Sequence, residues 1–354
     1  MRITTTRITV TKRHALTISR GTETGSVNVV VEVEHDGVVG LGEMAPNDVT
    51  GDHADTTEAA VAIWQDALAE ASPLDRQSVR DVLGADPMGS AGRAALDLAL
   101  FDWLGKRAGL PVWQMLGADP SRIAPTSVTV GINPPDVVRE IVPEIMRRTG
   151  ARVLKVKLGQ PAGIDADQMM FAAAQEAALA TGSHLGWRVD ANGGWDLADA
   201  RRMADWLATR DVEFIEQPLP QGSEGDLPAL FAHSPLPIIA DESVRTAADV
   251  AALADCVHGV NFKLMKSGGI DEALRIIHTA RAHRLSVMIG CMGESSLAIS
   301  AGAQLAPFVD CVDLDSHLNL LDDPFDGATY SDGVVRPTGR PGLGARWKAT
   351  GPNP

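Results

Sequence analysis

Val153-Leu154-Lys155-Val156-Lys157-Leu158-Gly159 reads as a short buried β-strand that carries two lysines. Side chains alternate across a strand, so Lys155 and Lys157 share one face while the aliphatic residues share the other. Two neighbouring ammonium groups on a segment otherwise patterned for burial are costly unless the protein uses them. The pattern therefore predicts a strand with functional lysines.

Later segments repeat this arrangement of a short apolar run with a charge near its C-terminal end. The charged positions are Asp190, Glu216, Asp241, Lys263, Asp313 and Asp315. Successive strands that end in charged residues are typical of an active site at the top of a β/α barrel. Strands and helices alternate from residue 127 onward, with a seventh strand expected at 287–292 and an eighth at 311–316. This repeat predicts a parallel barrel with right-handed crossovers.

The first part of the chain has a different pattern. Residues 3–10, 27–34 and 38–42 are expected to be antiparallel strands, the last two joined by an Asp-Gly turn, and helices follow. The polar segments 11–26 and 46–55 are expected to be mobile loops. We therefore predict an α+β capping domain with mobile specificity loops (1–120), a barrel (121–321), and a C-terminal segment (322–354) that returns to the capping domain.

The composition narrows the classes of partner. A formal net charge of −15 argues against nucleic acid or a membrane surface, because phosphate binding needs a basic patch. The three cysteines, Cys256, Cys291 and Cys311, form no CxxC motif and are expected to be reduced thiols. No apolar run reaches membrane-spanning length, and the N-terminus lacks a signal-peptide core. We expect a cytoplasmic protein that acts on a small molecule, with a homo-oligomer as the assembly.

Asp190, Glu216 and Asp241 lie at comparable positions on three successive predicted strands. Carboxylates that converge on one point repel strongly unless a cation neutralises them. Oxygen ligands without a nearby His or Cys favour Mg²⁺, with Mn²⁺ as a possible substitute. The alternative for any one of these acids is that it caps a loop or pairs with an arginine.

Lys157 and Lys263 are expected on the second and sixth strands, so they approach the barrel centre from opposite sides. A lysine acts as a base near neutral pH only if its pKa is lowered, and Lys155 and the metal are expected to lower it. The alternative is that such lysines extend to the surface. Two opposed bases and a metal-bound carboxylate indicate removal of the α-proton, giving an enediolate that the cation stabilises. Return of the proton on the opposite face inverts the carbon.

Several motifs carry a family resemblance. They are Lys155-Val-Lys157, Asp190-Ala-Asn192-Gly-Gly-Trp195, Glu216-Gln-Pro218, Ala240-Asp241-Glu-Ser243, Asn261-Phe-Lys263-Leu-Met-Lys266-Ser-Gly-Gly269, Ala94-Ala-Leu-Asp97-Leu-Ala-Leu-Phe-Asp102 and Pro111-Val-Trp-Gln-Met-Leu-Gly117. Together they resemble the muconate-lactonising subgroup of the enolase superfamily. The resemblance implies a modified TIM barrel, (β/α)7β, with a capping domain, and supporting roles for Asn192 and Lys266. A lysine base with Mg²⁺ is the known pattern of that superfamily.

Asp313 and Asp315 place two carboxylates on one strand face, without a basic neighbour in sequence, and such a pair suits a substrate ammonium. Within the subgroup this pair resembles the dipeptide epimerases, which implies epimerisation at the α-carbon of the C-terminal residue. Arg20 resembles the capping-domain arginine of L-Ala-D/L-Glu epimerases, which binds a side-chain carboxylate. The alternatives are loop-capping aspartates and a solvated arginine. Lys155 is expected to bind the substrate.

Ser316-His317 follows the aspartate pair, where the subgroup commonly has a small residue and proline. This departure alters the expected pocket for the N-terminal residue, unless His317 is an exposed loop residue. Other subgroup reactions remain open: N-acylamino-acid racemisation, o-succinylbenzoate synthesis and cycloisomerisation. A metal-dependent hydrolase would leave Lys157 and Lys263 idle, and a binding protein without catalysis would leave both the bases and the metal ligands idle.

Overall fold

A computed structural model describes residues 1–46, 49–84 and 89–349. In this part of the chain, eight parallel strands form the barrel in sequence order, and an isolated bridge between Thr126 and Val312 joins its first and last strands. The strands are β4 (Ser127–Val130), β5 (Val153–Lys157), β6 (Gly186–Asp190), β7 (Val212–Glu216), β8 (Ile238–Ala240), β9 (Gly259–Lys263), β10 (Ser286–Gly290) and β11 (Cys311–Val312). The predicted barrel is confirmed, although its last strand is shorter than expected.

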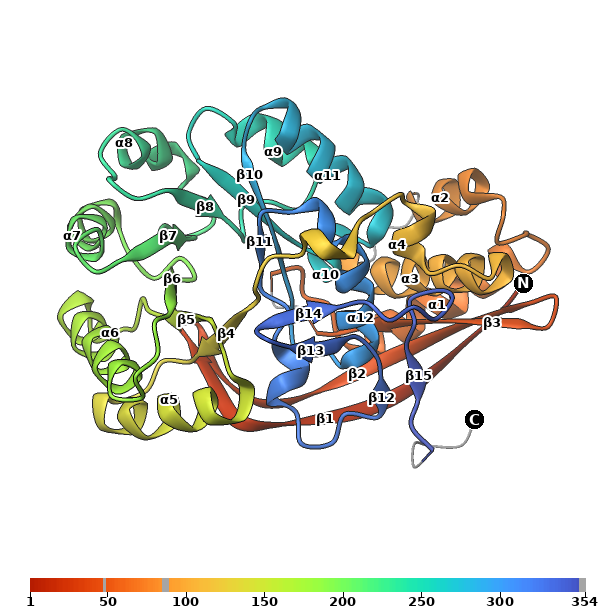
Figure 1. Cartoon of the computed structure of the whole chain (residues 1–354). Helices are drawn as coiled ribbons and strands as arrows, with labels where there is room; N and C mark the ends of the chain where they lie inside the picture. Colours follow the sequence, from red (N-terminus) through yellow and green to blue (C-terminus); the bar gives the residue numbers. More distant parts are fainter. Residues whose placement is uncertain (47–48, 85–88, 350–354) are drawn as a thin grey trace.

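Helices follow the strands and cover the outside of the barrel (Figure 1). They are α5 (Pro135–Thr149), α6 (Ile164–Leu179), α7 (Leu197–Leu207), α8 (Leu227–Phe231), α9 (Ala247–Leu253), α10 (Leu264–Ser267), α11 (Ile270–Ala282) and α12 (Ser296–Leu305). Short 3-10 turns lie at Pro120–Arg122, Glu224–Asp226, Ala306–Phe308 and Ser316–Asn319. The strands are buried along almost their whole length, as expected for a parallel sheet covered by helices.

The capping domain contains an antiparallel sheet and the helices α1 (Ala54–Leu68), α2 (Arg76–Gly84), α3 (Ser90–Ala108) and α4 (Val112–Met115). Its strands are β1 (Arg2–Ile18), β2 (Gly21–His35) and β3 (Val38–Met44). Asp36 and Gly37 both have positive φ, which matches the predicted hairpin turn. Strands β1 and β2 extend across the molecule to the barrel near α5 (Figure 1).

The prediction of a mobile loop at residues 11–26 is wrong. These residues continue the β1–β2 ladder, with Thr11 opposite Gly25 and Ile18 opposite Gly21. The ladder shifts register between Thr11 and Leu16, where the His14 backbone instead bonds to the Asn319 side chain, and threonine is itself well suited to a strand. The second predicted loop, 46–55, contains residues 47–48, which lie outside the described residues.

The C-terminal segment forms β12 (Phe325–Asp326), β13 (Thr329–Ser331), β14 (Val334–Arg336) and β15 (Arg346–Trp347). It contacts the capping domain where the backbone N–H of Leu343 donates to Asp102 at 2.7 Å and that of Val112 donates to Gly342 at 2.9 Å. Cys256, Cys291 and Cys311 are unpaired. In the described residues, no helix combines the length and the apolar character that crossing a bilayer would require.

Candidate active site

Three carboxylates meet at the C-terminal ends of β6, β7 and β8. Asp190 and Glu216 are the last residues of β6 and β7, and Asp241 directly follows β8. All three are fully buried, and one oxygen from each lies within 4.8 Å of the others. Among the described residues this is the group of acids arranged to hold a metal ion, and its oxygen ligands suit Mg²⁺.

The charge balance of this group is consistent with a bound cation. Burial raises the pKa of Glu216 to about 8, and the charge of Asp190 adds to that rise. Burial also acts to raise the pKa of Asp241, but Lys263 and Lys266 hold it well below its usual range. The raised pKa means that a negative charge on Glu216 is unfavourable in the middle of the group, and a divalent cation held there would favour the ionised carboxylate.

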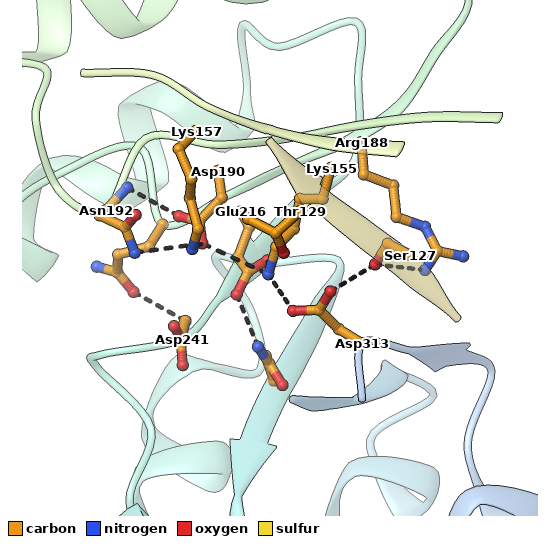
Figure 2. A network of polar contacts seen from close by, with 12 residues as sticks. Ser127, Thr129, Lys155, Lys157, Arg188, Asp190, Asn192, Glu216, Asp241 and Asp313 are labelled. Carbon is orange, nitrogen blue, oxygen red and sulfur yellow. Dashed lines mark hydrogen bonds and ion pairs between the residues drawn. The ribbon is translucent and has the colours of Figure 1, made fainter. Parts of the chain in front are cut away.

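The two predicted bases flank the carboxylates. Lys157 Nζ lies 2.5 Å from Asp190 Oδ2 (Figure 2), and Lys263 Nζ lies 2.8 Å from Asp241 Oδ2. Strands β5 and β9 are separated by the three strands that carry the metal ligands, so the lysines enter from opposite sides. Both side chains are nearly buried, at 8% and 9% exposure.

The protein's own groups do not supply the expected lowering of the lysine pKa at Lys263, although Lys155 acts in that direction. Burial acts to lower its pKa, but Asp241, Glu242 and Glu216 raise it above the ordinary value. The reason is that its nearest charged neighbours are carboxylates. A cation held by Asp241 and Glu216 would offset this negative charge and so favour the neutral base.

Lys155 lies on the same face of β5 but contacts other groups. Its Nζ is hydrogen-bonded to Asp313 and to Glu216, the latter at 3.2 Å, and lies 3.7 Å from Asp190 (Figure 2). Burial acts to lower the Lys155 pKa, yet these three carboxylates raise it well above its ordinary value. Lys155 is therefore a fixed cation that links the metal carboxylates to the eighth strand.

The two aspartates after β11 have different surroundings. Asp313 contacts Lys155 and accepts from Ser127 Oγ at 2.6 Å, so the fold supplies the basic neighbour that is missing in sequence. Asp315 accepts from the Thr129 backbone N–H at 2.6 Å, and among the described residues no cation pairs with it. Burial and the charge of Asp313 raise the pKa of Asp315. Asp315, unlike Asp313, therefore carries a partly buried charge that a substrate cation would stabilise.

The supporting residues hold the backbone around the metal carboxylates. The Asn192 N–H donates to Asp190 Oδ1 at 2.8 Å, and its side chain donates to Asp190 Oδ2 at 3.2 Å. Asn192 adopts a left-handed conformation with φ of 44°. Lys266 is buried and donates to Asp241, to its carbonyl, and to Val244 O at 3.1 Å. Both predicted supporting residues therefore contact metal carboxylates.

Arg20 lies at the tip of the β1–β2 hairpin and reaches the barrel. Its Nη1 donates to Asn192 O at 2.8 Å, and its Nη2 lies 2.8 Å from Glu242 Oε1. The guanidinium lines the same cavity as Lys157, Lys263 and Asp315. Its carboxylate partner in this structure belongs to the protein.

Several contributors to the cavity are not apparent from the sequence. Strand β1 lines one side of the cavity. The barrel adds apolar side chains from β4, α5 and the loop after β10, namely Val128, Val130, Ile141, Ile145 and Met292. Asn261 donates to Glu216 Oε1 at 2.6 Å. Asn261 belongs to the quoted β9 motif, but its hydrogen bond is to a residue of β7, which lies two strands away in the barrel. Only closure of the barrel brings these groups together.

His317 does not behave as an exposed loop residue. Both of its ring nitrogens are shielded from solvent and have no hydrogen-bond partner among the described residues. Burial lowers the pKa of His317 to about 4. Ser316 lines the cavity next to Asp315, whereas His317 is not among the lining residues.

The sequence and the fold match known proteins over nearly the whole chain. A "hydrophobic dipeptide epimerase" of Roseobacter litoralis is 52% identical over 336 residues, covering 94% of this chain and 95% of that protein. An "L-Ala-D/L-Glu epimerase" of Bacteroides thetaiotaomicron is 35% identical and covers 94% and 84% of the two chains. The structure of a dipeptide epimerase from Enterococcus faecalis with Mg and L-Leu-L-Tyr has a TM-score of 0.90 at 30% identity, covering 97% and 98% of the chains.

Two family models account for the two domains. Residues 2–117 match the N-terminal domain of mandelate racemase and muconate lactonizing enzyme. Residues 138–350 match the enolase C-terminal domain-like model. With the barrel, the cap and the three carboxylates in place, the chain belongs to the mandelate racemase/muconate lactonizing enzyme family of the enolase superfamily.

Proposed function

We propose that this protein is an isomerase, a Mg²⁺-dependent dipeptide epimerase that inverts the α-carbon of the C-terminal residue. The observation that carries the proposal is the placement of Lys157 and Lys263 on opposite sides of a buried group of three carboxylates. Asp315, which no protein cation neutralises among the described residues, supplies a place for the substrate ammonium. The names of the similar proteins agree with this activity.

The chemistry follows from these positions. Asp190, Glu216 and Asp241 would hold Mg²⁺, which supplies Lewis-acid stabilisation of the charge that a substrate carboxylate gains when its α-proton leaves. One lysine removes that proton and the other returns a proton to the opposite face. Because the two lysines are equivalent in type, either can start, and the reaction runs in both directions.

The polarity of the site orients the dipeptide. The substrate carboxylate lies toward the ends of β6, β7 and β8, and the ammonium lies toward Asp313 and Asp315 after β11. Lys155 partly neutralises Asp313, so one net negative charge faces the ammonium. A dipeptide matches this spacing of opposite charges, whereas an N-acylamino acid has no ammonium to place there.

Proton NMR in D₂O tests the proposal directly. The enzyme with Mg²⁺ is incubated with L-Ala-L-Glu and, separately, with L-Leu-L-Tyr, while the α-proton of the C-terminal residue is followed. Loss of that signal together with appearance of the L,D diastereomer is the expected result for at least one dipeptide. Exchange of N-acylamino acids without exchange of any dipeptide would favour the racemase alternative.

An Asp315→Asn variant separates the two reactions more sharply. The dipeptide reaction is expected to lose kcat/KM by roughly tenfold to a hundredfold, because a charge-assisted hydrogen bond to the ammonium is lost. Turnover of an N-acylamino acid, if present, would be unaffected. Equal turnover of dipeptides by Asp315→Asn and the wild type would contradict the assignment of this carboxylate.

A further inference from the structure

Strand β1 forms the roof of the cavity along one face. Along this stretch the cavity is lined by Lys12, His14, Ala15, Leu16, Ile18 and, just beyond the end of the strand, Arg20. Leu16 and Ile18 share one face of the strand, and the ladder with β2 shifts register between Thr11 and Leu16. Lys12 lies beside Gly293 after β10, and Arg20 lies beside Asn192 after β6. The strand therefore covers the cavity from the ammonium side to the metal side.

Each basic group on this face already has a carboxylate partner. The pairs are Lys12 with Glu23, His14 Nε2 with Glu144 Oε2 at 2.8 Å, and Arg20 Nη2 with Glu242 Oε1 at 2.8 Å. Lys12 is nearly buried, with 5% of its side chain exposed. A negatively charged substrate side chain would have to displace a protein carboxylate from one of them. The uncharged residues of this strand that line the cavity are Ala15, Leu16 and Ile18, and Leu16 and Ile18 have the larger side chains.

The contacts of Arg20 join the hairpin tip to the metal site. Arg20 and Ser19 both donate to the carbonyl of Asn192, each at 2.8 Å. Glu242 also accepts from the Asn192 side chain at 3.1 Å, and Glu242 itself directly follows Asp241. The hairpin is thus bonded to Asn192 and Glu242, which lie within two residues of Asp190 and Asp241. Glu242 is buried.

We infer that Arg20 is a positioning residue that holds the tip of the hairpin against the loops after β6 and β8, a role called here a latch. We also infer that Leu16 and Ile18 select an uncharged apolar side chain on the C-terminal residue of the substrate. The selection follows because the latch uses the guanidinium that would otherwise attract an acidic side chain. This inference rests on the dipeptide epimerase function proposed above. It assigns Arg20 a different role from the carboxylate receptor that the family resemblance implies.

Three dipeptides that differ in their C-terminal residue test the selectivity for the substrate side chain. L-Ala-L-Glu and L-Ala-L-Gln differ in charge at nearly constant shape, and L-Ala-L-Leu adds the apolar case. We expect the wild type to show the highest kcat/KM for L-Ala-L-Leu and roughly tenfold lower kcat/KM for the Glu dipeptide than for the Gln dipeptide. A preference for Glu over Gln would overturn the inference.

The variant Arg20→Met distinguishes the latch role of Arg20 from direct binding of an acidic substrate side chain. As a latch, Arg20→Met lowers kcat/KM for all three dipeptides by a common factor, roughly tenfold, and leaves their ratios unchanged. A loss confined to the Glu dipeptide would overturn the inference. Arg13→Met is the matched control, because Arg13 is exposed on the same strand and does not line the cavity. Ile18→Asn is expected to lower turnover of the Leu dipeptide several-fold more than that of the Gln dipeptide.

Hydrogen exchange tests the latch without any substrate. In the wild type with Mg²⁺, amides of residues 16–23 are expected to be protected, and Arg20→Met increases their exchange rate by about tenfold. Glu242→Gln produces a similar increase, and the double variant adds little to either single change. Unchanged exchange in Arg20→Met would overturn the latch. Failure of the proposed function itself is distinguishable, because it appears as absence of wild-type dipeptide turnover.

Discussion

At the scale of single residues, the proposed reaction depends on which lysine faces which side of the α-carbon. Lys157→Ala and Lys263→Ala are each expected to lower epimerisation by about 10²- to 10⁴-fold, because one of the two proton transfers loses its base. Each variant still exchanges the α-proton of one diastereomer with D₂O, and the two variants differ in which one. Proton NMR of each purified diastereomer measures this directly.

A remote lysine provides the control for these variants. Lys348 lies on the C-terminal segment, where it donates to Asp323 O at 2.6 Å, and Lys348→Ala is expected to retain wild-type exchange. Interconversion of both diastereomers at the wild-type rate by Lys157→Ala would contradict the two-base assignment. It would instead agree with a metal-dependent reaction in which this lysine is idle.

His317 is expected to make the folded protein sensitive to acid. Its pKa is lowered to about 4 by burial, whereas an unfolded histidine titrates near 6.5. Between these values the unfolded chain binds the extra proton, so stability falls as pH drops through this window. The full loss below pH 4 is on the order of 3 kcal/mol. Denaturant unfolding from pH 7 to pH 4 measures it.

The expected result is a smaller loss of unfolding free energy over this pH range in His317→Leu than in the wild type. Exposed His184 provides the matched control, because His184→Leu should keep the pH dependence of the wild type. Parallel curves for the wild type and His317→Leu would show that His317 takes up its proton equally in the folded and unfolded protein. In that case its burial would not affect acid stability.

At the scale of elements, the cap depends on close contact between β3 and α3. A Cβ added at Gly42 would lie 1.9 Å from Ala95 O, and one at Gly40 would lie 2.0 Å from Ala99 O. Gly42→Ala is therefore expected to destabilise the protein by about 1–3 kcal/mol, because the strand must move off the helix. Gly225→Ala is the control, since no atom lies within 4 Å of its added Cβ.

Thermal unfolding measures this effect, and hydrogen exchange locates it. Amides of β3 and α3 are expected to lose protection in Gly42→Ala, while those of the barrel strands keep theirs. An unchanged melting temperature would show that the two elements separate at little cost. The close contact of α3 with the strand explains its burial on nearly every side.

The long β1–β2 hairpin shows where a local pattern is ambiguous. A segment rich in threonine and glycine is compatible with both a loop and a strand, because these residues are polar but threonine favours extended backbone. Its ladder with β2 and its bonds to Asn192 and Glu242 select the strand. Those partners lie more than 170 residues away from Ser19 and Arg20, and no local signal indicates them.

At the scale of the whole molecule, metal binding and folding are expected to be coupled. A cation that binds only the folded site stabilises it by about 2.7 kcal/mol at a concentration of 100 times Kd. EDTA should therefore lower Tm and abolish turnover, and added Mg²⁺ should restore both. Calorimetry with and without EDTA measures the shift in Tm.

Variants on β7 assign this effect to the buried carboxylates. Glu216→Gln should lose the Mg²⁺-dependent shift in Tm, because a metal ligand is removed. Glu213→Gln should keep it, since Glu213 lies near the start of the same strand, is 40% exposed and pairs with Arg188. A full shift in Glu216→Gln would place the metal elsewhere.

The sequence by itself determined the barrel, and it placed the three carboxylates and the two lysines at the C-terminal ends of its strands. These follow from local patterns, because a charge at the end of an apolar strand identifies both the strand and the end where the site lies. Tertiary structure decided the partners: Lys155 contacts Asp313 at a separation of 158 residues, and Arg20 pairs with Glu242. It also decided that Lys263 is surrounded by carboxylates. Such pairings depend on barrel closure and on docking of the hairpin, which no spacing along the chain encodes.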